Sequence, residues 1–340
     1  MTINFTPTIL QILNQPNKPG GIQSVATVLA ETLEAKGLVC HKSRINLTSI
    51  LKDIMFFRKT LPTIVIVHGM SNLVTLRALL YLLLRRVARC RPIKTIWQVH
   101  FHPFSHHHRP LLAKLYFYSV NLTLASIADT VVAITPIEKQ YLAKHITSSK
   151  IRVIPNPLRS FSEDLHIENV CKYIEGENTS RPYVLTVGRN DYNKNITAVS
   201  ALTTAIKGAG YDSIIVTNSK DQIDANCTVY IDCSDAELNI LIANAYCVVI
   251  PAKYEAFSLI AIESIARGTP LICGSNVGAL SFGCVRRAAV ITDFTESSFL
   301  NSLRKVNLPL GVMNTLAIEV NSTFSTTTFS DNWLRLIRHV

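Results

Sequence analysis

The stretch Tyr183-Val-Leu-Thr-Val-Gly188-Arg189-Asn-Asp-Tyr-Asn-Lys194 decides the fold class of this chain. Its first five residues form a continuous apolar and β-branched run, which is typical of a parallel strand buried on both faces. A glycine turn follows, and the residues after the turn predict a helix near 195–209. Strand, turn and helix in this order are the repeating unit of an α/β sheet.

Runs of strand length recur on both sides of this stretch, and segments of helix length separate them. We therefore expect parallel strands that helices cover on both faces, which is a doubly wound α/β architecture. The predicted strands are residues 8–13, 63–68, 95–100, 130–135 and 151–154 before the stretch, and 213–217, 228–231, 247–250 and 270–273 after it.

Residues 158–181 interrupt this alternation, because they are polar and lack the periodicity of a strand or a helix. At 340 residues the chain also exceeds the usual size of a single core. The sequence predicts one Rossmann-like domain over 1–157, a linker over 158–181 and a second Rossmann-like domain over 182–325. Residues 326–340 are expected to form an amphipathic closing helix.

Basic residues are concentrated in the first half of the chain. Residues 1–150 contain 18 Lys and Arg against 5 Asp and Glu, whereas residues 151–340 contain 16 against 18. This asymmetry indicates an anionic partner for the first half. No recognition helix, RNA-binding aromatic motif or zinc finger supports nucleic acid, so we expect an acidic membrane surface.

The densest basic stretch follows a leucine-rich run over residues 73–84, which is too short to span a bilayer. A leucine-rich helix beside a basic cluster fits a segment that lies in a membrane interface. An ordinary buried helix with solvated arginines at its end is the alternative, and we favour it for the leucine run itself. The basic residues are Arg85, Arg86, Arg89, Arg91 and Lys94.

The eight cysteines are scattered and include no Cys-x-x-Cys pair, so neither a disulfide framework nor a zinc ribbon is expected. No secretory signal is recognised at the start of the sequence. We therefore expect reduced thiols and a cytoplasmic protein, peripheral on the inner face of the plasma membrane.

Gly188, Arg189 and Lys194 lie where a predicted strand ends and a helix begins. Ligands of open α/β sheets bind beyond the carboxyl ends of the strands. Two cations and the amide groups of a helix start make a site for an anion, and a diphosphate is the expected ligand. A surface turn with two solvated bases is the alternative.

Two glutamates follow the predicted strand 247–250. Glu255 lies in the turn after this strand, and Glu263 lies eight residues later in an otherwise apolar helix. A buried carboxylate needs hydrogen-bond partners, which the hydroxyls of a ribose diol can supply. A helix glutamate that faces solvent is the alternative.

Histidines cluster around His100, which ends a predicted strand; His102 and His106–His108 follow it. Imidazoles suit zinc or nickel, but no acidic or Cys ligand lies nearby in sequence, so we expect no metal site. The role of His106–His108 is left open.

Together these motifs resemble glycosyltransferase family 4, the glycosyl transferases group 1. The most specific element is Glu255-x7-Glu263 with Gly268-Thr-Pro270 after it, and the Gly-Arg…Lys turn is the second. The Gly20-Gly21 pair and Ile154-Pro-Asn-Pro157 resemble further segments of the family. The resemblance implies a GT-B fold, in which two Rossmann-like domains face a cleft and the C-terminal helix crosses back.

The resemblance also implies roles for single residues. The N-terminal domain would bind the acceptor and the C-terminal domain the nucleotide sugar. Fixed cations at the diphosphate would stabilise the departing leaving group. The implied catalytic residues are His100, Glu255, Arg189 and Lys194; the implied donor-binding residues are Gly21, Arg189, Lys194, Phe257, Ser258, Leu259 and Glu263.

The implied reaction is a retaining, metal-independent hexosyl transfer without a cofactor. UDP or GDP sugars would be donors, and a lipid-linked glycan, a lipopolysaccharide such as O-antigen, or another polysaccharide would be the acceptor. The chain departs from the family at Ser258, where a glycine is usual. A nucleotide-sugar epimerase of the same fold and a non-catalytic, membrane-associated binding protein are the alternatives.

Overall fold

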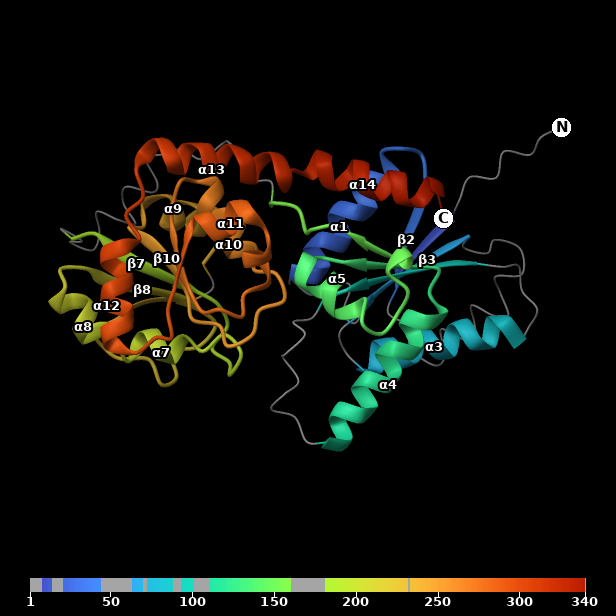
Figure 1. The fold of residues 1–340 in the computed structure, drawn as a ribbon, viewed down its shortest axis with the longest axis horizontal. Coiled ribbons are helices and arrows are strands. Elements are labelled where there is room, and N and C mark those ends of the chain that lie inside the picture. The colour runs from blue at the N-terminus through green and yellow to red at the C-terminus, as the bar shows by residue number, and fades with distance from the viewer. Residues whose placement is uncertain are drawn as a thin grey trace. The chain divides into compact units, whose positions relative to one another are not determined.

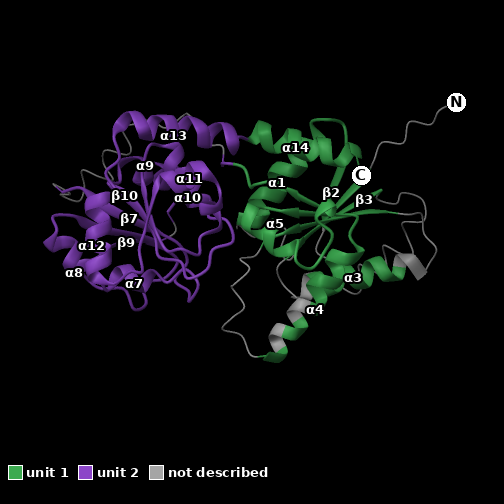
Figure 2. Cartoon of the chain, in the orientation of Figure 1, with its two compact units in different colours: residues 1–157, 326–340 green, residues 158–325 purple. Residues whose placement is uncertain are grey.

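A computed structural model describes residues 8–13, 21–43, 63–69, 72–87, 93–100, 111–159, 181–231 and 233–339. The chain divides into two compact units, which Figure 2 shows in different colours. Unit 1 comprises Met1–Pro157 together with Thr326–Val340, and unit 2 comprises Leu158–Ser325.

Unit 1 is built on a six-stranded parallel sheet with the strand order β2-β1-β3-β4-β5-β6 (Figure 1). Its strands are β1 (Thr8–Ile12), β2 (Val39–Ser43), β3 (Ile64–Gly69), β4 (Lys94–Val99), β5 (Thr130–Ala133) and β6 (Ile151–Val153). Its helices are α1 (Gly21–Glu34), α3 (Asn72–Val87), α4 (Leu111–Ile127), α5 (Pro136–Leu142), the 3₁₀ helix η1 (Ser148–Lys150) and α14 (Thr326–His339).

The sheet of unit 1 carries a hydrophobic core on each face, because successive side chains of a strand point to opposite faces. On β3, Ile64 and Ile66 pack with α1 and α14, whereas Val65 and Val67 pack with α3 and α4. Trp333 of α14 is fully buried in the first of these cores. The C-terminal helix is therefore a structural part of unit 1.

Unit 2 has a second six-stranded parallel sheet, with the order β12-β11-β10-β7-β8-β9. Its strands are β7 (Tyr183–Val187), β8 (Asp212–Thr217), β9 (Thr228–Ile231), β10 (Cys247–Ile250), β11 (Leu271–Cys273) and β12 (Ala289–Ile291). Its helices are α7 (Ile196–Ser200), α8 (Thr203–Gly208), α9 (Asp235–Asn244), α10 (Leu259–Ala266), η2 (Gly278–Ser281), α11 (Gly283–Arg287), α12 (Glu296–Lys305) and α13 (Leu310–Thr323).

Each sheet has one point at which the strand order reverses. In unit 2 the chain adds β8 and β9 on one side of β7 and then adds β10, β11 and β12 on the other. The carboxyl ends of β7 and β10 therefore flank the position at which open α/β sheets bind ligands. The corresponding position in unit 1 lies between β1 and β3.

Two edge strands differ from the sequence-based expectation. Strands β2 and β12 were not predicted; β2 contains the polar residues His41, Lys42 and Ser43, and β12 has no buried residue. The helix predicted near 195–209 divides into α7 and α8 at Ala201–Leu202. Among the described residues, no helix combines the length and apolar character needed to cross a membrane.

Candidate functional site

The loop after β7 presents Arg189 and Lys194 at the reversal point of unit 2. The carboxylate of Asp191 shapes this loop, since its Oδ1 accepts hydrogen bonds from the backbone amides of Asn193 and Lys194 at 3.0 Å each. Asn195 then adopts a left-handed conformation with φ of 52° and leads into α7. The tight turn places Lys194 next to Gly188, where an added Cβ would lie 3.4 Å from the Lys194 side chain.

The loop after β10 is tied to the loop after β7 by two hydrogen bonds. The amide of Lys253 donates to the carbonyl oxygen of Asn193 at 2.8 Å, and the Asn195 side chain donates to the Pro251 carbonyl oxygen at 3.2 Å. Glu255 is fixed by its backbone, which pairs with residues 276–278. The two loops thus form one connected edge of unit 2.

The predicted diphosphate and sugar residues meet at this edge. The ammonium group of Lys194 donates a hydrogen bond to the carboxylate of Glu255 and forms an ion pair with it. Arg189 has a side chain that is 75% exposed, and it forms an ion pair with Asp191 at 3.3 Å. The edge therefore combines a positioned cation, a carboxylate and an exposed guanidinium group.

The start of α10 lies directly after Glu255. Phe257 packs edge-on against Phe282 and Phe324, so its buried side chain faces the core. Ser258 precedes the helix with φ of 81° and ψ of 90°, a conformation that favours glycine. The first amide groups of a helix have no intrahelical acceptor, so those at Ser258 and Leu259 are suited to bind an anion.

Glu263 lies on α10 and has partners that the sequence did not indicate. Arg159 binds both oxygens of its carboxylate, from Nε to Oε1 at 2.6 Å and from Nη2 to Oε2 at 2.8 Å. The hydrogen bond to Glu263 raises the pKa of Arg159. The two residues are 104 positions apart, and no local pattern in the sequence links them.

His100 lies in unit 1, directly after β4, and is almost completely buried. Its ring stacks on that of His68, which lies on β3, with 5.9 Å between the ring centroids. Burial, with a smaller contribution from the neighbouring His68, lowers the pKa of His100 to about 3. His100 is therefore a neutral imidazole near pH 7, suited to hydrogen bonding rather than to charge stabilisation.

Gln11 supports this histidine pair from β1, at the reversal point of unit 1. Its side-chain amide donates to the Ala26 carbonyl oxygen at 3.2 Å, so its Oε1 is left to accept from His68 Nε2 at 2.7 Å. His68 thus carries its proton on Nε2. Burial lowers its pKa to about 3 as well. The sequence suggested His100 but gave no signal for Gln11 and His68, which lie inside apolar strands.

Gly21 is the first residue of α1 in unit 1. Gly20, His102, His106–His108, Arg89 and Arg91 lie outside the described residues. Within the described part of the chain, no three His, Cys, Asp or Glu side chains gather as a metal site would require. The expected independence from metals and cofactors stays a prediction.

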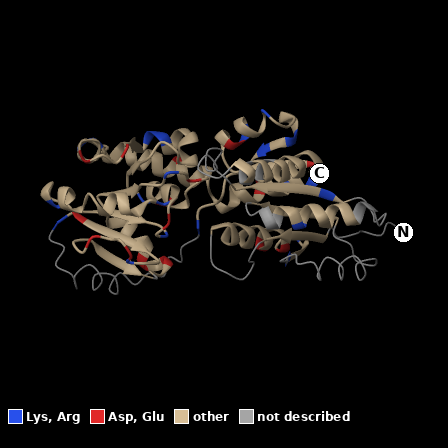
Figure 3. Cartoon of the chain, turned by 90° about the horizontal axis from the view of Figure 1, so that it is seen from below, with Lys and Arg blue, Asp and Glu red and all other residues tan. Residues whose placement is uncertain are grey.

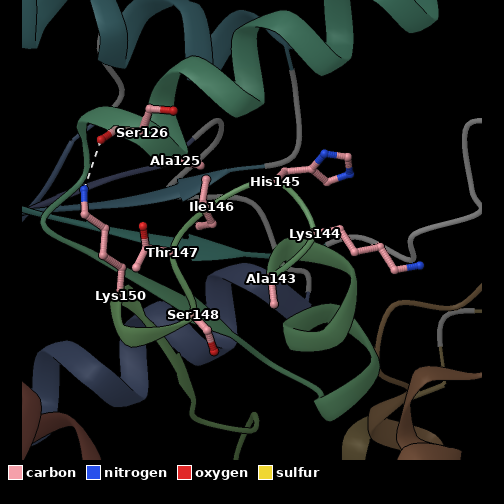
Figure 4. A pocket seen from close by; sticks show the side chains of 9 residues that line it. All are labelled: Ala125, Ser126, Ala143, Lys144, His145, Ile146, Thr147, Ser148 and Lys150. Atoms are coloured by element: carbon pink, nitrogen blue, oxygen red, sulfur yellow. Dashed lines mark hydrogen bonds between the residues drawn. The ribbon is translucent and has the colours of Figure 1, made fainter.

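A hollow of about 490 Å³ lies on unit 1 between the C-terminal ends of α4 and α5. Lys150 reaches across it and donates to the carbonyl oxygens of Ser126, at 3.2 Å, and Ala128, at 3.3 Å (Figure 4). The lining residues precede β5 and β6 and therefore mark the amino ends of these strands. The hollow is thus at the opposite edge of the sheet from His100.

Comparison with known proteins finds one matching family model. Residues 172–282, which lie within unit 2, match a family model described as "Glycosyl transferases group 1". The matched segment contains the Gly188–Lys194 loop, Glu255 and Glu263, which are the residues on which the sequence resemblance rested. Over this segment the chain is similar to the family that the sequence resemblance indicated.

Solved structures of similar fold cover nearly the whole length of this chain. Sucrose-phosphate synthase from Thermosynechococcus elongatus has a TM-score of 0.76 at 17% identity, with 98% of each chain covered. Anabaena HepE in complex with UDP-glucose has a TM-score of 0.72 at 12% identity, covering 98% of this chain and 100% of that one.

A third similar structure is WaaG, described as a glycosyltransferase involved in lipopolysaccharide biosynthesis. It has a TM-score of 0.64 at 12% identity and covers 92% of this chain and 94% of its own. At these identities the likeness establishes the fold, and the GT-B class expected from the sequence is confirmed. Among curated proteins, none matches this chain.

Proposed function

We propose that this chain is a group 1 glycosyltransferase and transfers a hexose from a UDP or GDP sugar, with retention of configuration and without a metal ion. The observation that carries the proposal is the meeting of Lys194 and Glu255 at the reversal point between β7 and β10. A cation that binds a diphosphate and a carboxylate that binds sugar hydroxyls belong side by side, since the diphosphate is bonded to the sugar.

Arg189 and Lys194 bind the diphosphate in this proposal, and the amide groups of Ser258 and Leu259 add donors at the start of α10. Negative charge grows on the diphosphate as the bond to the sugar breaks, so fixed cations there lower the barrier. The similar structures of Anabaena HepE in complex with UDP and with UDP-glucose support a nucleotide-sugar donor.

In this proposal the configuration of the sugar is retained because the acceptor hydroxyl attacks on the same face from which the leaving group departs. The leaving phosphate takes the proton of the acceptor hydroxyl, so the enzyme needs no nucleophile. Glu255 holds hydroxyls of the transferred sugar in this proposal, and the neutral His100 serves as a hydrogen-bonding group of unit 1.

A glycan acceptor at an anionic membrane surface is the second part of the proposal. The charge excess of residues 1–150 supports it, although most of these Lys and Arg residues lie outside the described side chains. Figure 3 shows the charges that are described. Exposed apolar residues on the first turns of α4 also suit a lipid surface: Leu111 is 70% exposed, Leu112 81% and Leu115 55%.

A thermal-shift panel of UDP, GDP, ADP and CMP with their sugars tests the donor. Selective stabilisation by one nucleotide identifies the base, and transfer or slow hydrolysis of its sugar establishes turnover. An epimerase would instead release a sugar epimer, and a non-catalytic protein would bind the donor without any turnover. No shift with any nucleotide from a folded sample would overturn the proposal.

A further inference from the structure

Both oxygens of the Glu263 carboxylate accept a hydrogen bond from a protein side chain. Arg159 binds both of its oxygens, and the Glu263 side chain has no exposed surface. The remaining branch of the guanidinium group, Nη1, donates to Asp235 Oδ1 at 2.6 Å. Asp235 is 70% exposed at the start of α9, so the arginine is held between a buried and a solvent-facing carboxylate.

This pairing conflicts with the role that Glu263 has in the proposed function. A ribose diol would donate its two hydroxyl hydrogens to the two Glu263 carboxylate oxygens that Arg159 binds. The Glu263 side chain has no access to solvent. Bidentate guanidinium–carboxylate pairs are among the stronger hydrogen-bonded contacts in proteins. The nucleotide must therefore displace Arg159, or Glu263 does not bind it.

We propose that Arg159 is a latch on the donor site: it occupies Glu263 in the ligand-free protein and gives way when the ribose arrives. This inference rests on the proposed function and adds a residue that regulates its donor site. Arg159 is the second residue of unit 2. The backbone beside it is anchored, because the amide of Leu158 donates to the Phe324 carbonyl oxygen at 2.7 Å.

Asp235 gives the displaced guanidinium group a place to go. It already accepts one hydrogen bond from Arg159, and its exposed carboxylate has further acceptor positions. Next to Arg159 lies a hollow of about 310 Å³, which Asn239, Arg267 and Asn321 also line. The latch can thus open by a side-chain movement within unit 2.

When Arg159 occupies Glu263, the apparent affinity for the nucleotide falls in proportion to the fraction of molecules in which Glu263 is accessible. Weakening the latch must then tighten nucleotide binding, which is the opposite of what loss of a supporting residue would do. Arg159→Lys is the decisive variant, because lysine keeps the charge that compensates Glu263 but cannot span both carboxylate oxygens.

The experiment is calorimetric titration of UDP and GDP, and of their 2′-deoxy analogues, into the unmutated protein and Arg159→Lys. We expect the variant to bind the ribonucleotide about threefold to tenfold more tightly, the gain expected when most molecules start closed. The gain should shrink for the 2′-deoxy analogue, since the hydroxyl that exchanges with Arg159 is absent.

Arg267→Lys is the matched control. Arg267 lines the same hollow, but it donates to the backbone carbonyl oxygen of Glu263, at 2.6 Å, rather than to the carboxylate. Its nucleotide affinity should stay within twofold of that of the unmutated protein. Asp235→Asn, which weakens the acceptor for the displaced guanidinium group and leaves Glu263 unchanged, should not tighten nucleotide binding.

Unchanged or weaker ribonucleotide binding by Arg159→Lys would overturn the latch. So would unaltered binding by Glu263→Gln, because Glu263 would then not contact the ribose. Both results leave the proposed transferase standing if Lys194→Ala still loses nucleotide affinity. Absence of nucleotide binding by the unmutated protein would instead overturn the proposed function, and the latch with it.

Discussion

Lys194, in the loop after β7, forms an ion pair with Glu255, in the loop after β10. The pair joins the two strands that flank the reversal point of the unit 2 sheet. The pair therefore places opposite charges where the phosphate and the sugar of a bound donor would be adjacent. Separate substitutions of Lys194 and Glu255 distinguish an effect on nucleotide affinity from an effect on transfer.

Lys194→Ala should weaken binding of the donor nucleotide about tenfold to a hundredfold, because a hydrogen bond to a charged group contributes about 1.5–3 kcal/mol. Titration calorimetry measures the change. Lys207→Ala, which removes the same charge from the last turn of α8, should bind normally. Equal losses in both variants would point to a general effect of net charge.

Glu255→Ala should retain nucleotide affinity and reduce transfer about a hundredfold or more, since its proposed partner is the sugar and its interaction is needed in the transition state. The measurement pairs calorimetry with a transfer assay on the same sample. A parallel decline of affinity and turnover would assign Glu255 to nucleotide binding instead.

Ser258→Gly should stabilise unit 2 by about 1 kcal/mol, because a non-glycine residue with positive φ carries backbone strain. Hydrogen exchange of the β7 and β10 amides reports this stability. Asn195→Gly is the comparison: asparagine tolerates its left-handed φ, and its side chain binds the Pro251 carbonyl oxygen. Stabilisation by Asn195→Gly alone would contradict the assignment of strain to Ser258.

The stability of unit 1 should fall as the pH decreases from about 6.5 towards 3. His68 and His100 each have a folded pKa of about 3, against about 6.5 in an unfolded chain. In this window the unfolded state binds more protons, so each histidine contributes a slope of about 1.4 kcal/mol per pH unit. Above pH 6.5 their contribution is constant.

Tryptophan fluorescence during urea unfolding measures this slope selectively, because both tryptophans of the chain, Trp97 and Trp333, are buried in unit 1. His100→Gln should lower the slope towards that of one histidine. A slope that is the same in the variant would show that His100 titrates normally.

Binding to anionic vesicles should decrease as salt increases, since basic residues are attracted to acidic lipids through a screened interaction. Cosedimentation with phosphatidylglycerol-containing vesicles measures it, with phosphatidylcholine vesicles as the control. Arg85→Gln with Arg86→Gln should reduce the bound fraction. Binding that is independent of salt would remove the electrostatic part of the proposal.

The sequence predicted the parallel strands and the positions of the candidate site residues after β7 and β10 because both depend on local patterns. Buried strands such as Tyr183–Val187 are continuous apolar runs, and Arg189 and Glu255 lie within a few residues of the ends of β7 and β10. The edge strand β12, which has no buried residue, was not predicted.

The contacts of the site were less predictable because they depend on tertiary structure. The Arg159–Glu263 pair joins residues that share no local motif, and the strained φ of Ser258 is a property of the folded loop. The sequence indicated that Glu263 needs polar partners, but it could not show that another side chain of the chain, Arg159, supplies them.

The position of α14 has a consequence for how the protein is made on the ribosome. Unit 1 contains the first strand of the chain, yet Trp333 and Phe329, which fill its core beside Ile9, are synthesised after all of unit 2. One apolar face of the nascent unit 1 sheet therefore stays incomplete until α14 has been translated. Chaperone demand and aggregation during expression should thus depend on whether α14 has been translated.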